Sequence, residues 1–148
     1  MSYANDMPTQ SSTDLASDLR LGCMRLARRL RTERVSDDLT LSQWAVLGSL
    51  ERHGGLTVGE LARVERVKPP SMTRIVNSLA DAGLVVRRPH AADGRQVVVD
   101  LTEEALSLLT EDRRRRTAWL ALQVAELPDD ERALLARAVP LLDRLAST

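Results

Sequence analysis

Apolar residues recur at helical spacing along much of the chain. In the first stretch, from about Asp14 to Arg34, they form one stripe at intervals of three and four residues, made of Leu15, Leu19, Cys23, Leu26 and Leu30. Two later leucine-rich stripes run from Leu106 to Leu122 and from Leu134 to Leu145. This spacing predicts long amphipathic helices at both ends of the chain.

Two capping boxes mark the starts of helices in the middle of the chain. Thr40 with Gln43 precedes "LSQWAVLGSLERH", which stops at Gly54-Gly55, and Thr57 with Glu60 precedes the shorter "VGELARV". In each box the threonine oxygen can accept a hydrogen bond from a free amide, while the Gln or Glu side chain reaches back. The two signals predict a second and a third helix.

A fourth helix is predicted over "PPSMTRIVNSLADAG", with Pro69 as the cap and Pro70 as the first helical residue. Its buried stripe would be Met72, Ile75, Val76, Leu79 and Ala82, and Gly83 suits a left-handed cap. The β-branched runs "LVVRR" and "QVVVDL" flank a turn at Asp93-Gly94 and predict a hairpin. Further helices are expected from Thr102 to Ala125 and from Pro128 onward.

The order of elements predicts a mainly α fold with a small β-hairpin wing. Two short helices, a tight turn and a hairpin make a winged helix-turn-helix at 40–101. Helical regions at 14–39 and 102–148 flank it, and we expect residues 1–13 to be a disordered tail. Spacing alone also fits a protein-docking module.

Composition narrows the function. The net charge of the 148 residues is zero, but residues 63–95 hold seven basic side chains against three acidic ones, which favours nucleic acid as a partner. One cysteine and two histidines are too few for a structural zinc site and predict a reducing, cytoplasmic environment. Since no glycine-rich phosphate loop or activated nucleophile is visible, we expect neither an enzyme nor a cofactor.

The start of the fourth helix has candidate DNA-binding chemistry. Pro69 cannot cap the amides of Ser71, Met72 and Thr73, which would then face a phosphate at the positive helix end. Ser71, Thr73 and Arg74 would project toward base edges. Arg74 could bind guanine with two hydrogen bonds, and Asn77 is a second candidate for a base contact. Alternatively, the prolines only end the third helix and Arg74 is a solvated surface residue.

The predicted hairpin tip, Asp93-Gly94-Arg95, is a second candidate DNA contact. An arginine at the end of a narrow ribbon can enter the minor groove, where the potential is most negative. Asp93 could hold the guanidinium of Arg95, or that of Arg87 or Arg88. Alternatively, Asp93-Gly94 is only a turn and Arg95 balances Asp93.

These segments together resemble the MarR family of bacterial transcription regulators, above all in "DGRQVVVDLT" and "PPSMTRIVNSLADAGLVVR". The resemblance implies a homodimer formed by the first, fifth and sixth helices, on a pseudo-palindrome with half-sites about 10 bp apart. Lys68 stands where family members often have a side-chain cap such as serine, and its charge suits a phosphate. The predicted DNA-binding residues are Lys68, Pro70, Ser71, Met72, Thr73, Arg74, Asn77, Arg88, Asp93, Gly94 and Arg95.

The resemblance also implies a small aromatic or phenolic effector, with Cys23, Met24, Trp44 and His53 as candidate contacts. Alternatively, Met24 and Trp44 are ordinary core residues, Cys23 is a buried inert thiol and His53 caps a helix end. The basic run "EDRRRR", from Glu111 to Arg116, fits a solvated face paired with its own acids. The sequence therefore predicts a ligand-responsive repressor, with a winged-helix protein-interaction module as the alternative.

Overall fold

The computed structural model describes residues 10–148, which fall into two compact units divided after Glu33. The first unit contains helix α1 (Ser12–Arg31), whose cap Ser11 accepts a hydrogen bond from the amide of Asp14 at 3.1 Å. Residues 1–9 of the predicted tail lie outside the described residues, and the helix begins inside the remainder of that tail. No residue of α1 is buried.

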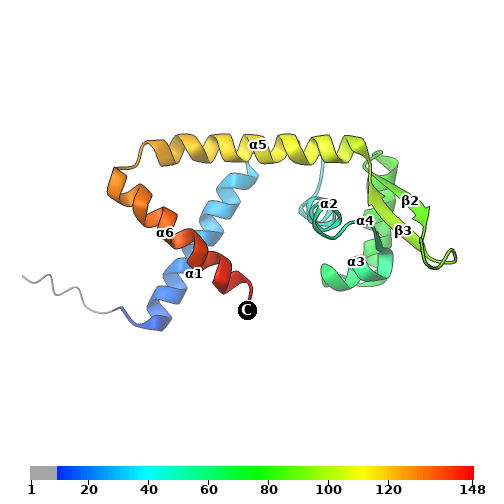
Figure 1. The fold of residues 1–148 in the computed structure, drawn as a ribbon, viewed down its shortest axis with the longest axis horizontal. Helices are drawn as coiled ribbons and strands as arrows, with labels where there is room; N and C mark the ends of the chain where they lie inside the picture. The colour runs from blue at the N-terminus through cyan, green and yellow to red at the C-terminus, as the bar shows by residue number, and fades with distance from the viewer. Residues whose placement is uncertain (1–9) are drawn as a thin grey trace, which may run out of the picture. The chain divides into compact units, whose positions relative to one another are not determined.

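The second unit, residues 34–148, has the predicted order of helices and hairpin, which confirms the fold class (Figure 1). Thr40 and Thr57 each close a complete capping box. The elements are α2 (Leu41–His53), β1 (Leu56–Thr57), α3 (Val58–Val64), α4 (Pro69–Asp81), β2 (Val85–Pro89), β3 (Val97–Leu101), α5 (Glu103–Ala125) and α6 (Asp129–Ala146). We refer to α2 through β3, residues 41–101, as the winged lobe.

The wing belongs to a three-stranded antiparallel sheet in the order β1-β3-β2. Strand β1 is only two residues long, and the sequence pattern did not predict it. In the hairpin, Val85 pairs with Leu101, Arg87 with Val99 and Pro89 with Val97. Because paired residues in an antiparallel ladder share a face, these six side chains lie on one face of the wing.

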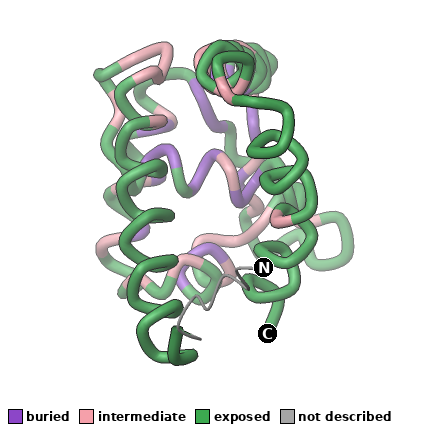
Figure 2. The backbone as a smooth tube through the Cα atoms, turned by 90° about the vertical axis from the view of Figure 1, so that its left-hand side faces the viewer, coloured by how far each residue is buried: buried purple, intermediate pink, exposed green. Residues whose placement is uncertain are grey.

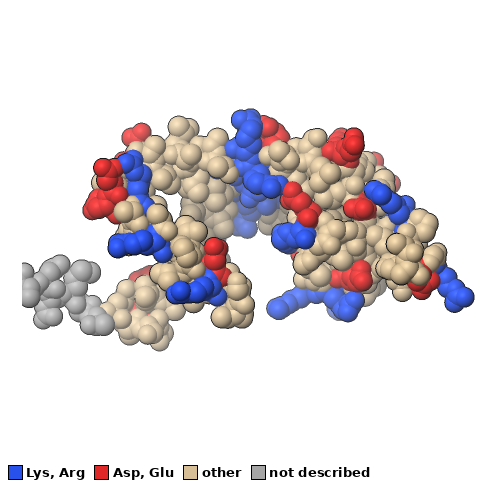
Figure 3. All heavy atoms as spheres, viewed as in Figure 1, with Lys and Arg blue, Asp and Glu red and all other residues tan. Residues whose placement is uncertain are grey.

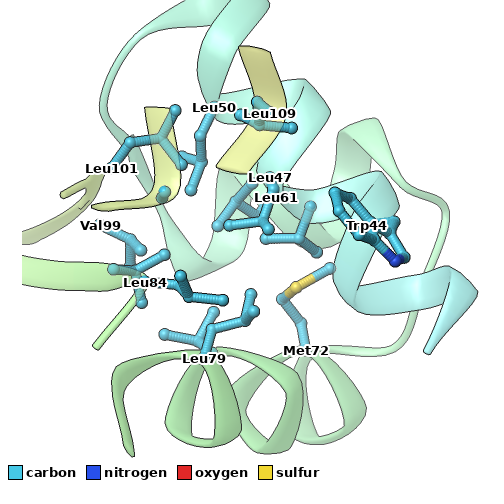
Figure 4. Close-up of a cluster of buried hydrophobic side chains, with 14 of the residues drawn as sticks. Trp44, Leu47, Leu50, Leu61, Met72, Leu79, Leu84, Val99, Leu101 and Leu109 are labelled. Atoms are coloured by element: carbon cyan, nitrogen blue, oxygen red, sulfur yellow. The ribbon is translucent and has the colours of Figure 1, made fainter. Parts of the chain in front are cut away.

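The hydrophobic core lies inside the winged lobe and under the first turns of α5 (Figure 4). Completely buried side chains come from each helix of the lobe and from β3: Leu47, Leu61, Met72, Val76, Leu79 and Val99. Each such side chain contributes roughly 1.5–3 kcal/mol by leaving water. Figure 2 shows the buried backbone concentrated in this part of the chain, whereas α6 has no buried residue.

Backbone turns fix both ends of α4. Before it, Arg66 adopts a left-handed conformation (φ 53°), while the amide of Val67 donates to the carbonyl oxygen of Ala62 at 2.9 Å. After it, Gly83 (φ 74°) forms the same kind of turn, as predicted, and the amide of Leu84 donates to Leu79. The left-handed conformation of Arg66 raises the energy of the backbone, because the Cβ of an L-residue is crowded there.

A buried carboxylate anchors the chain where it enters the second unit. Asp112 on α5 is completely buried, accepts a hydrogen bond from the amide of Val35 at 3.3 Å and pairs with Arg116 at 2.8 Å. The prediction that this run is a solvated face is therefore wrong for Asp112. It is confirmed for Glu111, whose side chain is 42% exposed and pairs with Arg114 at 2.7 Å.

Among residues 10–148, none of the helices combines the length and the apolar composition needed to span a bilayer.

Candidate nucleic-acid interface

Helix α4 begins one residue earlier than predicted, with Lys68 rather than Pro69 as its cap. Lys68 makes no side-chain capping bond, and the next two residues, Pro69 and Pro70, have no amide hydrogen. The amide of Met72 already donates to the carbonyl oxygen of Lys68 at 3.0 Å. Of the first-turn donors, only the amide of Ser71 remains, so the predicted cluster of three free amides is wrong. The helix needs no capping side chain because the prolines remove most of the groups that a cap would satisfy.

Several predicted DNA-binding side chains lie on the exposed surface of this helix. Lys68, Pro70, Thr73, Arg74 and Asn77 are exposed, and Ser71 is half-buried. The hydroxyl of Thr73 donates to the carbonyl oxygen of Pro69 at 3.0 Å, which leaves its oxygen free to accept. Arg74 forms no hydrogen bond or ion pair with another described residue, so all its guanidinium donors are available.

Met72 does not belong to this interface. Its side chain is completely buried in the core of the winged lobe, and its amide is bonded within the helix. The prediction that Met72 contacts DNA is therefore wrong. Its place in the predicted buried stripe is correct, because that stripe follows the helical period.

Gln43 joins α2 to α4 through a side-chain hydrogen bond. Its amide nitrogen donates to the hydroxyl of Ser78 at 2.8 Å, and the residue is buried between α2 and α4. The sequence identified Gln43 only as part of a capping box. Its second contact joins residues far apart in the chain, so no local pattern could have indicated it.

The hairpin tip is held by its own side chains. Asp93 accepts a hydrogen bond from the amide of Arg95 at 3.0 Å, and Nδ1 of His90 accepts from the amides of Ala92 and Asp93 at 3.1 and 3.2 Å. Asp93 forms no ion pair with another described residue, so the predicted hold on an arginine side chain is wrong. Gly94 and Arg95 are exposed, and Figure 3 shows a cationic side chain at the outer end of the wing.

The two neighbouring arginines of β2 lie on opposite faces. Arg88, a predicted DNA contact, lies within 3.6 Å of Asp100 on the face away from the core. Arg87 lies on the inner face and donates a hydrogen bond to Asn77 of α4. Arg87 was not among the predicted site residues, although strand alternation places it on the same face as buried Val85.

The four predicted effector contacts are in different environments. Cys23 and Met24 are exposed on α1, so the expectation of buried side chains at these positions is wrong for this chain, whose α1 buries nothing. Trp44 is 6% exposed and packs in the core, with the guanidinium carbon of Arg34 4.9 Å from the centre of its ring. His53 is the exposed last residue of α2.

Two hollows of the described surface lie away from these residues. One, of about 260 Å³, lies between α2 and α4 and includes Val46, Glu65 and Ile75 in its lining. The other, of about 480 Å³, runs along α5 from Thr110 to Ala121. None of the four predicted effector contacts lines either hollow.

Helices α3 and α4, the turn between them and the β2–β3 wing together define a winged helix-turn-helix protein. The sequence profile of the MarR family matches residues 37–96. HTH-type transcriptional regulator MT0903.1 of Mycobacterium tuberculosis is 48% identical over 89% of this chain and 92% of its own length. The chain belongs to the MarR family.

Other regulators are similar to this protein over nearly the whole chain. HTH-type transcriptional repressor MdtR of Bacillus subtilis is 29% identical over 94% of this chain and 92% of its own length. A Pseudomonas aeruginosa PA01 protein of known structure has a TM-score of 0.84 and 38% identity, covering 94% of this chain and 99% of its own. The protein is a DNA-binding transcription regulator and not an enzyme, and the protein-interaction alternative is not favoured.

Proposed function

We propose that this protein is a repressor that binds a pseudo-palindromic operator as a homodimer, with α4 in the major groove and the wing over the neighbouring minor groove. The fold supplies the reading elements, and the name of the Bacillus subtilis relative supports repression. In this arrangement the two lobes of a dimer would meet half-sites about 10 bp apart.

The observation that carries the proposal is the exposed, unpaired Arg74 in the second turn of α4. Side chains near the start of a recognition helix reach base edges, and a free guanidinium can donate two hydrogen bonds to guanine O6 and N7. Lys68 and Ser71 lie at the start of the same helix, where a cation and one free amide can receive a phosphate. Arg95 at the wing tip supplies the second contact.

The homodimer is supported by apolar side chains that the single chain leaves in water. On α6 the exposed set is Leu134, Leu135, Val139, Leu141, Leu142 and Leu145. On α1 it is Leu15, Leu19, Leu21, Met24 and Leu26. Exposed surfaces of this kind mark interaction sites, and a second copy of the chain would cover them.

A random pool of short duplexes tests the operator. The protein is mixed with the pool, and the retained DNA is sequenced at increasing salt. We expect a two-fold symmetric motif with half-sites one turn apart and an affinity that falls steeply with salt. Retention without a motif would contradict sequence-specific repression, and no retention would contradict DNA binding altogether.

Two substitutions test the contacts within that operator. Arg74→Ala is expected to relax the preference at one base pair, by about 1–3 kcal/mol. Arg95→Ala should weaken binding most at operators with A·T-rich flanks, where the minor groove is narrow. Arg132→Ala on α6, whose partner is Asp129, is the control and should leave both properties unchanged. Unchanged affinity and base preference in both test variants would contradict the assigned site.

The proposal also includes an effector, a small aromatic or phenolic compound that lowers the affinity for the operator. Its candidate contacts are Cys23, Met24, Trp44 and His53. Its support is the family membership alone. Titrating benzoate and phenol against the protein–operator complex tests it, with Trp44→Leu as the site variant and Leu122→Ala on α5 as the control. Operator release by neither compound contradicts an effector of this class.

A further inference from the structure

The inner face of the wing continues beyond the core and reaches α4. Val85, Val99 and Leu101 on this face are buried, and Arg87, opposite Val99, is the next residue along β2 on the same side. Arg88 points to the other face because strand residues alternate. The position in the strand therefore directs Arg87, and not its neighbour, toward the recognition helix.

Arg87 meets Asn77 there. Its Nη2 donates a hydrogen bond to Oδ1 of Asn77. The orientation of the asparagine amide follows from chemistry, because a guanidinium can only donate and so must face the oxygen. The amide nitrogen of Asn77 therefore points away from the wing. Within residues 10–148 neither side chain forms another hydrogen bond or ion pair, and both are exposed.

This pairing changes what Asn77 can recognise. A free asparagine binds adenine with two hydrogen bonds, since its oxygen accepts from N6 and its nitrogen donates to N7. Arg87 occupies one of the two lone pairs of Oδ1 and places its positive charge beside the other, which disfavours a second donor there, so Asn77 is left to act through its N–H donors. Guanine presents two adjacent acceptors, O6 and N7, whereas adenine presents one acceptor beside a donor.

We propose that Arg87 is a positioning residue that makes Asn77 a donor-only reader, so that Asn77 selects guanine and rejects adenine at one position of each half-site. The inference rests on the proposed placement of α4 in the major groove. Because the guanidinium is charged, its hydrogen bond to Asn77 is stronger than a bond between two neutral groups.

The full-length wild type, Arg87→Met and Asn77→Ala are each selected against the same random duplex pool. Asn77→Ala identifies the position, because the preference there should disappear. Arg87→Met frees Oδ1 without adding a polar group, so the preference at that position should move from guanine toward adenine by at least about fivefold. Arg87→Lys, which keeps a donor and a charge, should retain guanine. Arg88→Met on the opposite face is the matched control: it should lower the overall affinity, since Arg88 is itself a predicted DNA contact, but leave the base preference at this position unchanged.

Four outcomes overturn the inference. If Arg87→Met lowers affinity equally for all sequences and guanine stays preferred, Arg87 only contacts phosphate. If Asn77→Ala alters no position, or if the wild type prefers adenine there, Asn77 is not a donor-only reader. A wild type that enriches no motif contradicts the proposed function itself, and the inference falls with it.

Discussion

The winged lobe and helix α6 use similar side chains in opposite ways. In the lobe, leucine, valine and methionine side chains from α2, α3, α4 and the sheet are completely buried against one another. On α6 the leucines recur with the same helical spacing, yet no residue of that helix is buried (Figure 2). The lobe buries its own hydrophobic surface, while α6 leaves its apolar side chains exposed. Folding and assembly should therefore respond to different substitutions.

The largest effect is expected in the lobe core. Leu47→Ala removes a completely buried side chain of α2 and should lower the free energy of unfolding by about 2–5 kcal/mol, because it leaves a cavity. Leu134→Ala on α6, where the side chain is 58% exposed, is the matched control and should cost under about 1 kcal/mol in dilute, monomeric protein. Urea unfolding measures both. Equal costs would remove the distinction between the two regions.

Assembly is the complementary test. Leu141, 49% exposed, lies two turns from Leu134 on the same side of α6. Leu141→Glu should leave the lobe folded but weaken dimerisation at least about 100-fold, or about 2.7 kcal/mol, since it would place a charge in an apolar interface. Analytical ultracentrifugation over a concentration series measures the constant. Ala136→Glu on another side of the helix should not change it, and an unaltered dimer in Leu141→Glu would show that α6 is not the contact.

Adding a methyl group at glycines of the lobe should have a smaller effect on stability. A Cβ added at Gly55 would lie 2.5 Å from Cγ1 of Val98, and a β-branched side chain cannot turn aside easily. Gly55→Ala should therefore lower the free energy of unfolding by about 1–3 kcal/mol. At Gly94 in the wing tip an added Cβ would meet no atom within 4 Å, so Gly94→Ala should change stability by under about 0.5 kcal/mol. Thermal unfolding of both variants measures this difference in stability. Equal melting temperatures of the two variants would contradict it.

What the sequence predicted correctly was local. The capping boxes at Thr40 and Thr57 and the left-handed Gly83 depend on residues within one turn, so their spacing was sufficient. The periodic stripe of α4 likewise placed Val76 and Leu79 in the core. Even here the cap of α4 was misplaced by one residue, since two successive prolines suit more than one starting position.

What the sequence missed depends on residues distant in the chain. Strand β1 exists because Leu56 and Thr57 pair with Val99 and Val98, and two residues carry no period of their own. The contact between Arg87 and Asn77 joins a strand to a helix, and the burial of Asp112 depends on the amide of Val35. Charge counts identified Arg87 as basic, but only the register of the sheet distinguishes it from Arg88.

The smallest expected effect is on the pKa of Glu111, a carboxylate of α5 outside the lobe. The hydrogen bond from Arg114 holds the pKa of Glu111 below its usual range, and the charges of Arg114 and Arg115 act in the same direction while desolvation opposes them. A lowered pKa means that the folded chain favours the ionised form, so this contribution is present above the unfolded pKa and is lost as the pH falls through the folded one. Arg114→Gln should raise the pKa of Glu111 toward that of a free glutamate and make acid unfolding slightly less dependent on Glu111. NMR titration of the side chain measures the change, with Arg132→Gln as the control. An unchanged pKa would mean that solvent already screens the pair, and this part of α5 would then contribute nothing through its surface charges.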